Sequence, residues 1–153
     1  MANNFPLQPL VNLSRQKNDA ATRKLGLLNR EQQSAQSKLD TLQQFRKDYQ
    51  AKFHEAASNG MDQHDLRNFQ DFINRLDDAI TQQRGVIEQT QRSVQTGRSE
   101  LSETQRRMKS FDTLAQRHVE AEKKLETKAE QKMQDEYTGR FAAHKSAEKN
   151  GEN

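Results

Sequence analysis

Apolar residues recur along most of the chain at alternating intervals of three and four residues. In a segment from residue 25 to residue 56, eight of ten such positions are apolar or aromatic. The ten positions hold Leu25, Leu28, Gln32, Ala35, Leu39, Leu42, Arg46, Tyr49, Phe53 and Ala56. Residues that alternate in this way lie on one stripe of an α-helix, so the segment predicts an amphipathic helix that pairs with another helix.

A second segment carries a stricter repeat. Eight consecutive positions spaced by seven residues, the a positions of a heptad, are apolar: Leu66, Ile73, Ile80, Ile87, Val94, Leu101, Met108 and Ala115. A seven-residue repeat held over this length predicts a left-handed coiled coil. The accompanying d positions are weaker, because they hold Phe69, Leu76, Gln83, Thr90, Gly97, Thr104, Phe111 and His118.

The two segments are separated by Ser58-Asn59-Gly60. Asn-Gly is typical of turns, and glycine after a helix end adopts the left-handed conformation that closes many helices. Asp62 then suits the N-cap of a second helix, with Asp65 near the positive end of its dipole. We therefore expect a turn within residues 57–62 and an antiparallel packing of the two helices.

The predicted fold is all-α: a long antiparallel two-helix coiled-coil hairpin whose second helix is longer and overhangs the first. The first arm is expected at about residues 10–57, the hinge at 58–61, the second arm at about 62–138 and a frayed tail at 139–153. Residues 1–153 would form a single coiled-coil domain.

Composition argues against a compact enzyme. Leu, Ile, Val and Phe account for 27 of 153 residues, below the roughly 20% at which a chain struggles to build a globular core. The chain has no cysteine, and its four histidines lie at no metal-ligand spacing. We expect no catalytic residues, no cofactor and no metal.

Charge and hydropathy limit the kinds of partner and the cellular location that the sequence favours. Twenty-five basic and twenty-two acidic residues give a net charge of only +3, and the two signs alternate, which favours a solvated coiled-coil face over a nucleic-acid site. The first residues lack the features of a signal peptide, and no apolar run approaches a membrane span. We expect a soluble, intracellular protein without membrane insertion.

Two phenylalanines fall outside the a and d stripe. Phe45 and Phe72 occupy g positions, each one residue before an a position, and the g rows of antiparallel helices follow the same edge. The pairing expected from a turn at Gly60 places the two rings next to each other. Two interpretations stay open: the rings widen the hairpin core, or they form a partner-binding surface.

Several segments resemble the flagellar type III export protein FliJ family. They are the Leu39–Leu42–Phe45–Tyr49 run, Asn59-Gly60-Met61, Arg67-Asn68-Phe69-Gln70-Asp71-Phe72-Ile73, Leu76-Asp77-Asp78-Ala79-Ile80 and Gln131-Lys132-Met133-Gln134-Asp135-Glu136-Tyr137. The resemblance covers roughly residues 5 to 140. The Asn-Gly hinge followed by the aromatic segment is its most specific part.

The resemblance implies a coiled coil similar to the gamma-subunit stalk of rotary ATP synthases. Members dock in the hexameric export ATPase FliI, contact the cytoplasmic domain of the export gate FlhA and bind export chaperones, at the cytoplasmic face of the inner membrane. By the same resemblance, the gate-binding surface comprises Leu42, Phe45, Tyr49, Phe72, Leu76 and Ala79. A coiled-coil scaffold of a virulence-type secretion system and a nucleic-acid-binding coiled coil are the competing interpretations.

Overall fold

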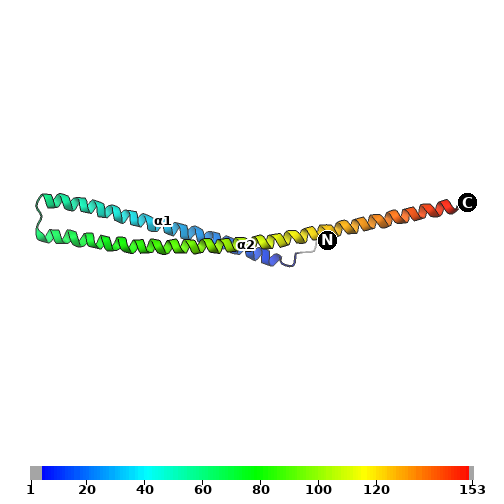
Figure 1. The fold of residues 1–153 in the computed structure, drawn as a ribbon, viewed down its shortest axis with the longest axis horizontal. Coiled ribbons are helices and arrows are strands. Elements are labelled where there is room, and N and C mark those ends of the chain that lie inside the picture. Colours follow the sequence, from blue (N-terminus) through cyan, green and yellow to red (C-terminus); the bar gives the residue numbers. More distant parts are fainter. Residues whose placement is uncertain (1–4, 152–153) are drawn as a thin grey trace. The chain divides into compact units, whose positions relative to one another are not determined.

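The computed structural model describes residues 5–151, which form two long helices and no strand. Helix α1 comprises Gln8–Ser58 and helix α2 comprises Gln63–Gly151 (Figure 1). Two compact units divide the chain. One contains residues 16–105 with the turn, and the other combines residues 5–15 with residues 106–151.

The unit of residues 16–105 is an antiparallel hairpin. Hydrogen bonds between side chains of α1 and α2 join residues far apart in sequence: Lys24 Nζ lies 3.0 Å from Glu100 Oε2, and Thr104 Oγ1 donates to Asn18 Oδ1 over 3.2 Å. Nearer the turn, Gln83 Nε2 donates to the carbonyl oxygen of Ala35 over 2.8 Å. A residue closer to the turn in α1 is thus bonded to a residue closer to the turn in α2, as antiparallel helices require. These pairs confirm the predicted hairpin.

The turn occupies residues 59–62, within the predicted range. Gly60 has a φ of 88°, a left-handed conformation that a side chain would strain. The amide of Leu66 donates to the carbonyl oxygen of Asp62 over 3.0 Å, so Asp62 is the N-cap of α2. The local chemistry of Asn59-Gly60 and Asp62 thus separates two helices that the heptads alone would not delimit.

The predicted heptad positions form the interface between the helices. Every a and d position of 25–56 and of 66–118 is buried or half-buried, whereas most residues between them are exposed. The centre of the core contains Ala35, Leu39, Ile80 and Ile87, with Leu42 packed against it. Since burial of apolar side chains is the main stabilising contribution in a coiled coil, this cluster anchors the hairpin.

Gly97 allows a close approach of the helices. A Cβ atom at residue 97 would lie 2.9 Å from Leu28 Cδ1 and 3.4 Å from Leu25 Cδ1. Gly85, by contrast, has nothing within 4 Å of its Cβ direction. The two glycines of α2 therefore have different roles, because Gly97 makes room for leucines and Gly85 does not.

We expect Gly85→Ala to raise the free energy of unfolding by about 0.5–1 kcal/mol, the usual gain in helix propensity. Gly97→Leu should instead lower it by about 1–3 kcal/mol, because the added side chain overpacks the interface. Urea denaturation followed by circular dichroism measures both. Equal effects of the two substitutions would contradict the assigned role of Gly97.

The other unit pairs residues 5–15 with the part of α2 that begins at residue 106. Val11 is only 1% exposed, Arg15 Nη2 lies 3.1 Å from Asp112 Oδ1, and the rings of Phe5 and His118 are 5.2 Å apart. From residue 123 to residue 151 every residue of α2 is exposed. These residues form the overhang that the sequence predicts.

The sequence predicts a frayed tail at residues 139–153, but α2 continues through Gly139 to Gly151. Residues 152 and 153 of that tail lie outside the described residues. A single glycine costs a helix only about 1 kcal/mol, and the following residues favour helix. Ser146 Oγ donates to the carbonyl oxygen of Ala142 over 3.0 Å, and His144 lies 3.9 Å from Glu148. Neither described helix carries an apolar stretch long enough to cross a bilayer.

Candidate interaction surface

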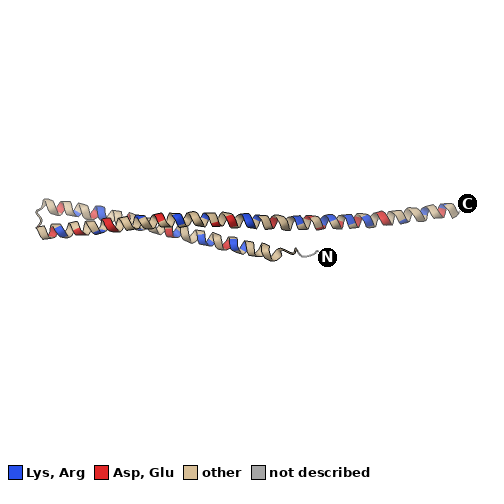
Figure 2. Ribbon diagram, turned by 60° about the horizontal axis from the view of Figure 1, so that its bottom comes forward, with Lys and Arg blue, Asp and Glu red and all other residues tan. Residues whose placement is uncertain are grey.

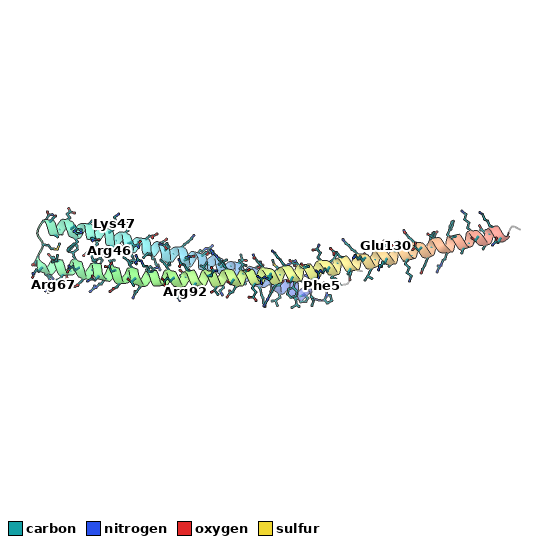
Figure 3. All side chains as sticks on the ribbon, in the orientation of Figure 1. Phe5, Arg46, Lys47, Arg67, Arg92 and Glu130 are labelled. Carbon is teal, nitrogen blue, oxygen red and sulfur yellow. The ribbon has the colours of Figure 1, made fainter. Side chains whose placement is uncertain are left out.

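Charged residues occur along both helices, with basic and acidic residues interspersed (Figure 2). They project outward along the whole length of α1 and α2, as the labelled Lys47, Arg67, Arg92 and Glu130 show (Figure 3). One ion pair reaches into the interface: Arg46 occupies an a position and its guanidinium donates two hydrogen bonds to the Asp77 carboxylate. The hydrogen bond to Asp77 raises the pKa of Arg46.

Aromatic rings accumulate on the turn-proximal half of the hairpin. Tyr49 of α1 packs against two rings of α2, with centroids 4.9 Å from Phe69 and 4.3 Å from Phe72. Phe53 extends the cluster, since its centroid lies 5.6 Å from that of Phe69. Tilted ring pairs at such distances stabilise beyond the area that they bury.

Large apolar side chains remain exposed at one edge of this cluster. Phe45 is 58% exposed and Phe72 is 42% exposed, although both belong to the helices of the hairpin. Val86 continues the g row of α2 and is 43% exposed. The edge therefore presents apolar surface next to a half-buried aromatic cluster, an arrangement that often marks an interaction site.

The six residues implied by the family resemblance lie at different depths. We call them the aromatic edge: Leu42, Phe45, Tyr49, Phe72, Leu76 and Ala79. Leu76 is buried, Leu42, Tyr49 and Ala79 are half-buried, and only the two phenylalanines are exposed. Phe45 and Phe72 are thus the residues of the set most accessible to a partner.

The expected pairing of Phe45 with Phe72 is wrong in detail. The ring that contacts Phe72 is Tyr49, and no ring contact joins Phe72 to Phe45 among the described residues. The reason is the position of Phe45 along α1: with a turn at residues 59–62, residue 49 lies opposite Phe72, and Phe45 lies about one helical turn farther from the hinge. The exposed rings are separate members of one edge, and Phe72 also contributes to packing.

Sequence reasoning missed a hollow at the turn end of the hairpin. It is lined by Tyr49, Ala56, Gly60, Met61, Asp62, Asp65, Asn68 and Phe69. Asp65 occupies the g position one heptad before Phe72, which is a signal that could have placed it on the same edge. Within residues 5–151, no cluster of three His, Cys, Asp or Glu side chains is arranged to hold a metal ion.

These features define a class of protein: an all-α coiled-coil hairpin with an exposed aromatic edge and a helical overhang. The sequence profile of the family described as "Flagellar FliJ protein" matches residues 3–147. The chain is 30% identical over 145 residues to the flagellar FliJ proteins of Salmonella typhi and of Escherichia coli strain K12, covering 95% of this chain and 99% of each relative. The chain therefore belongs to the flagellar FliJ family and is a component of flagellar protein export.

A solved structure shares the fold. The structure of a putative YscO homolog, CT670 from Chlamydia trachomatis, superposes with a TM-score of 0.66 and covers 88% of this chain and 91% of its own. The sequences are 16% identical, so this likeness concerns the fold alone. A long helical hairpin is thus a solution that two quite different sequences reach.

Proposed function

We propose that this protein is a non-enzymatic, stalk-like component that couples the hexameric export ATPase FliI to the cytoplasmic domain of the export gate FlhA. It also binds export chaperones. Membership of the flagellar FliJ family supports this role. The observation that carries the proposal is the aromatic edge, where two exposed phenylalanines stand on a rigid helical hairpin.

The aromatic edge is the proposed gate-binding site. Phe45 and Phe72 offer large rings with little conformational freedom to lose, and such side chains dominate many protein interfaces. The half-buried Leu42, Tyr49 and Ala79 support them from the helix interface. Because both helices contribute, the site requires the folded hairpin rather than a single helix.

The proposed ATPase contact belongs to the other unit. There the exposed part of α2 carries large apolar residues at four-residue spacing, namely Leu125, Met133, Tyr137 and Phe141 with Ala129 between them. They lack an intramolecular partner helix, since residues 123–151 are exposed throughout. The protein would act in the cytoplasm, at the cytoplasmic face of the inner membrane and without inserting into it.

Affinity capture of the tagged full chain with purified export ATPase and the gate's cytoplasmic domain tests the proposal. We expect both proteins to be retained, each without the other. Deletion of residues 123–151 should abolish ATPase capture and preserve gate capture. Failure to retain either protein, with the hairpin folded by circular dichroism, would contradict the coupling role.

A further inference from the structure

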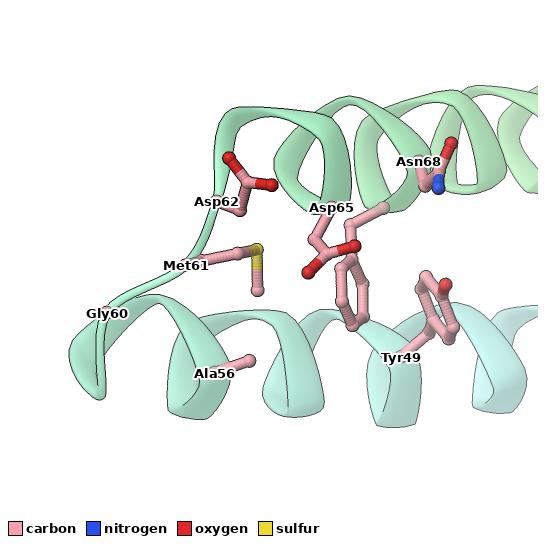
Figure 4. Close-up of a pocket in the computed structure, with 8 residues that line it drawn as sticks. Tyr49, Ala56, Gly60, Met61, Asp62, Asp65 and Asn68 are labelled. Atoms are coloured by element: carbon pink, nitrogen blue, oxygen red, sulfur yellow. The ribbon is translucent and has the colours of Figure 1, made fainter.

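The hollow at the turn end of the hairpin is an open surface depression with a volume of about 400 Å³. Met61 of the turn and Asp65 of the first turn of α2 point into the space between the two helix ends, opposite Ala56 and Tyr49 of α1 (Figure 4). Asp62 lies where α2 begins (Figure 4). The hollow thus combines a thioether, an aromatic wall and two carboxylates.

The two carboxylates have no cationic partner. Neither Asp62 nor Asp65 forms a side-chain hydrogen bond or ion pair within the described part of the chain. Their position near the N-terminus of α2 is favourable to the helix dipole, which accounts for their place in the sequence. It leaves their oxygens free to accept hydrogen bonds from outside the molecule.

Charge is distributed unevenly between the turn end and the rest of the chain. Residues 48–71 contain five carboxylates and two lysine or arginine residues, a net charge of −3, while the whole chain carries +3. An anionic partner such as nucleic acid would be repelled at this end. A cationic partner would be attracted there, and the attraction would weaken with added salt.

We propose that the hollow binds an arginine or lysine side chain of a basic segment in a partner protein. The charged group would donate hydrogen bonds to the Asp62 and Asp65 carboxylates, and arginine would match them best because it presents several donors in a fixed plane. The aliphatic stem would lie against Met61 and the rings of Tyr49 and Phe69, where a cation is also attracted to the ring faces. The hollow shares Tyr49 with the aromatic edge, but its two carboxylates lie outside the proposed gate-binding site.

Nuclear magnetic resonance titration of the full chain with the capped tetrapeptide Phe-Arg-Phe-Arg tests the proposal. The Met61 methyl, one of four methionine methyls, reports directly on the hollow. We expect its resonance to shift on titration with this peptide and to remain nearly unchanged with Phe-Gln-Phe-Gln. An equal shift with the glutamine peptide would overturn the requirement for a cation.

Two matched double variants test whether the peptide binds at the hollow. Asp62→Asn/Asp65→Asn keeps an N-cap side chain, since asparagine caps helices as well as aspartate, and should weaken binding about tenfold by removing two ion pairs. Asp71→Asn/Asp78→Asn removes the same net charge from exposed positions outside the hollow and should weaken binding at most about twofold, through long-range electrostatics. Equal weakening by the two variants would show a general charge effect and would refute the site.

Discussion

Ile87→Asp is expected to lower the free energy of unfolding of the hairpin by about 3–5 kcal/mol, and Ile80→Asp should have a similar effect. Ile80 and Ile87 are 7% and 8% exposed and belong to the central core cluster with Ala35 and Leu39. An aspartate at either site buries a carboxylate without a basic partner and removes an apolar side chain. A domain is stable by only about 5–15 kcal/mol, so much of the helix content should be lost at moderate temperature.

Circular dichroism during thermal and urea denaturation measures this effect. Gln82→Asp provides the matched control, because residue 82 lies between the two isoleucines on the exposed face of α2. It adds the same charge without burying it and should change the unfolding free energy by about 0.5 kcal/mol or less. Unchanged melting of both isoleucine variants would show that the heptad frame does not carry the stability of the hairpin.

Phe45→Ala/Phe72→Ala is expected to weaken binding of the gate's cytoplasmic domain by more than about thirtyfold. Truncation of an aromatic anchor commonly costs about 2 kcal/mol or more, and about 1.4 kcal/mol corresponds to a factor of ten in affinity. Binding of the export ATPase should persist, because the proposed ATPase contact uses the exposed residues of α2 in the other unit. Isothermal titration calorimetry with each partner gives the two affinities.

Leu27→Ala is the control for the phenylalanine variant. Leu27 is 59% exposed, about as much as Phe45, and lies outside the aromatic edge. It should leave gate affinity unchanged. Gate affinity that also survives the double phenylalanine change would exclude the aromatic edge as the gate site.

The stability of the double variant separates binding from packing. Phe72 packs on Tyr49, so its removal should lower the melting temperature modestly, whereas Phe45 makes no ring contact among the described residues. The single changes Phe45→Ala and Phe72→Ala distinguish the two roles. A collapse of melting temperature together with loss of both affinities would mean that the rings serve the hairpin core.

The fold and the residues of the interface between the helices can be predicted from the sequence alone. Heptad periodicity is a local property of the chain, and every predicted a and d position of residues 66–118 is less exposed than most of its neighbours. Asn59-Gly60 and Asp62 determined the turn in the same way, because turn and cap preferences act over a few residues. The resemblance to the flagellar FliJ family was also available from residue patterns alone, and the family comparison confirms it.

Which side chains contact each other across the two helices depends on how the helices pack in the folded chain. Phe45 lies about one helical turn farther from the hinge than the residue opposite Phe72, and so Tyr49 rather than Phe45 contacts Phe72. The extent of α2 beyond Gly139 was also beyond prediction, since one glycine is a weak helix breaker among good helix formers. The hollow at the turn end of the hairpin depends on the distance between the end of α1 and the start of α2. That distance is set by the packing of the helices and not by any local sequence pattern.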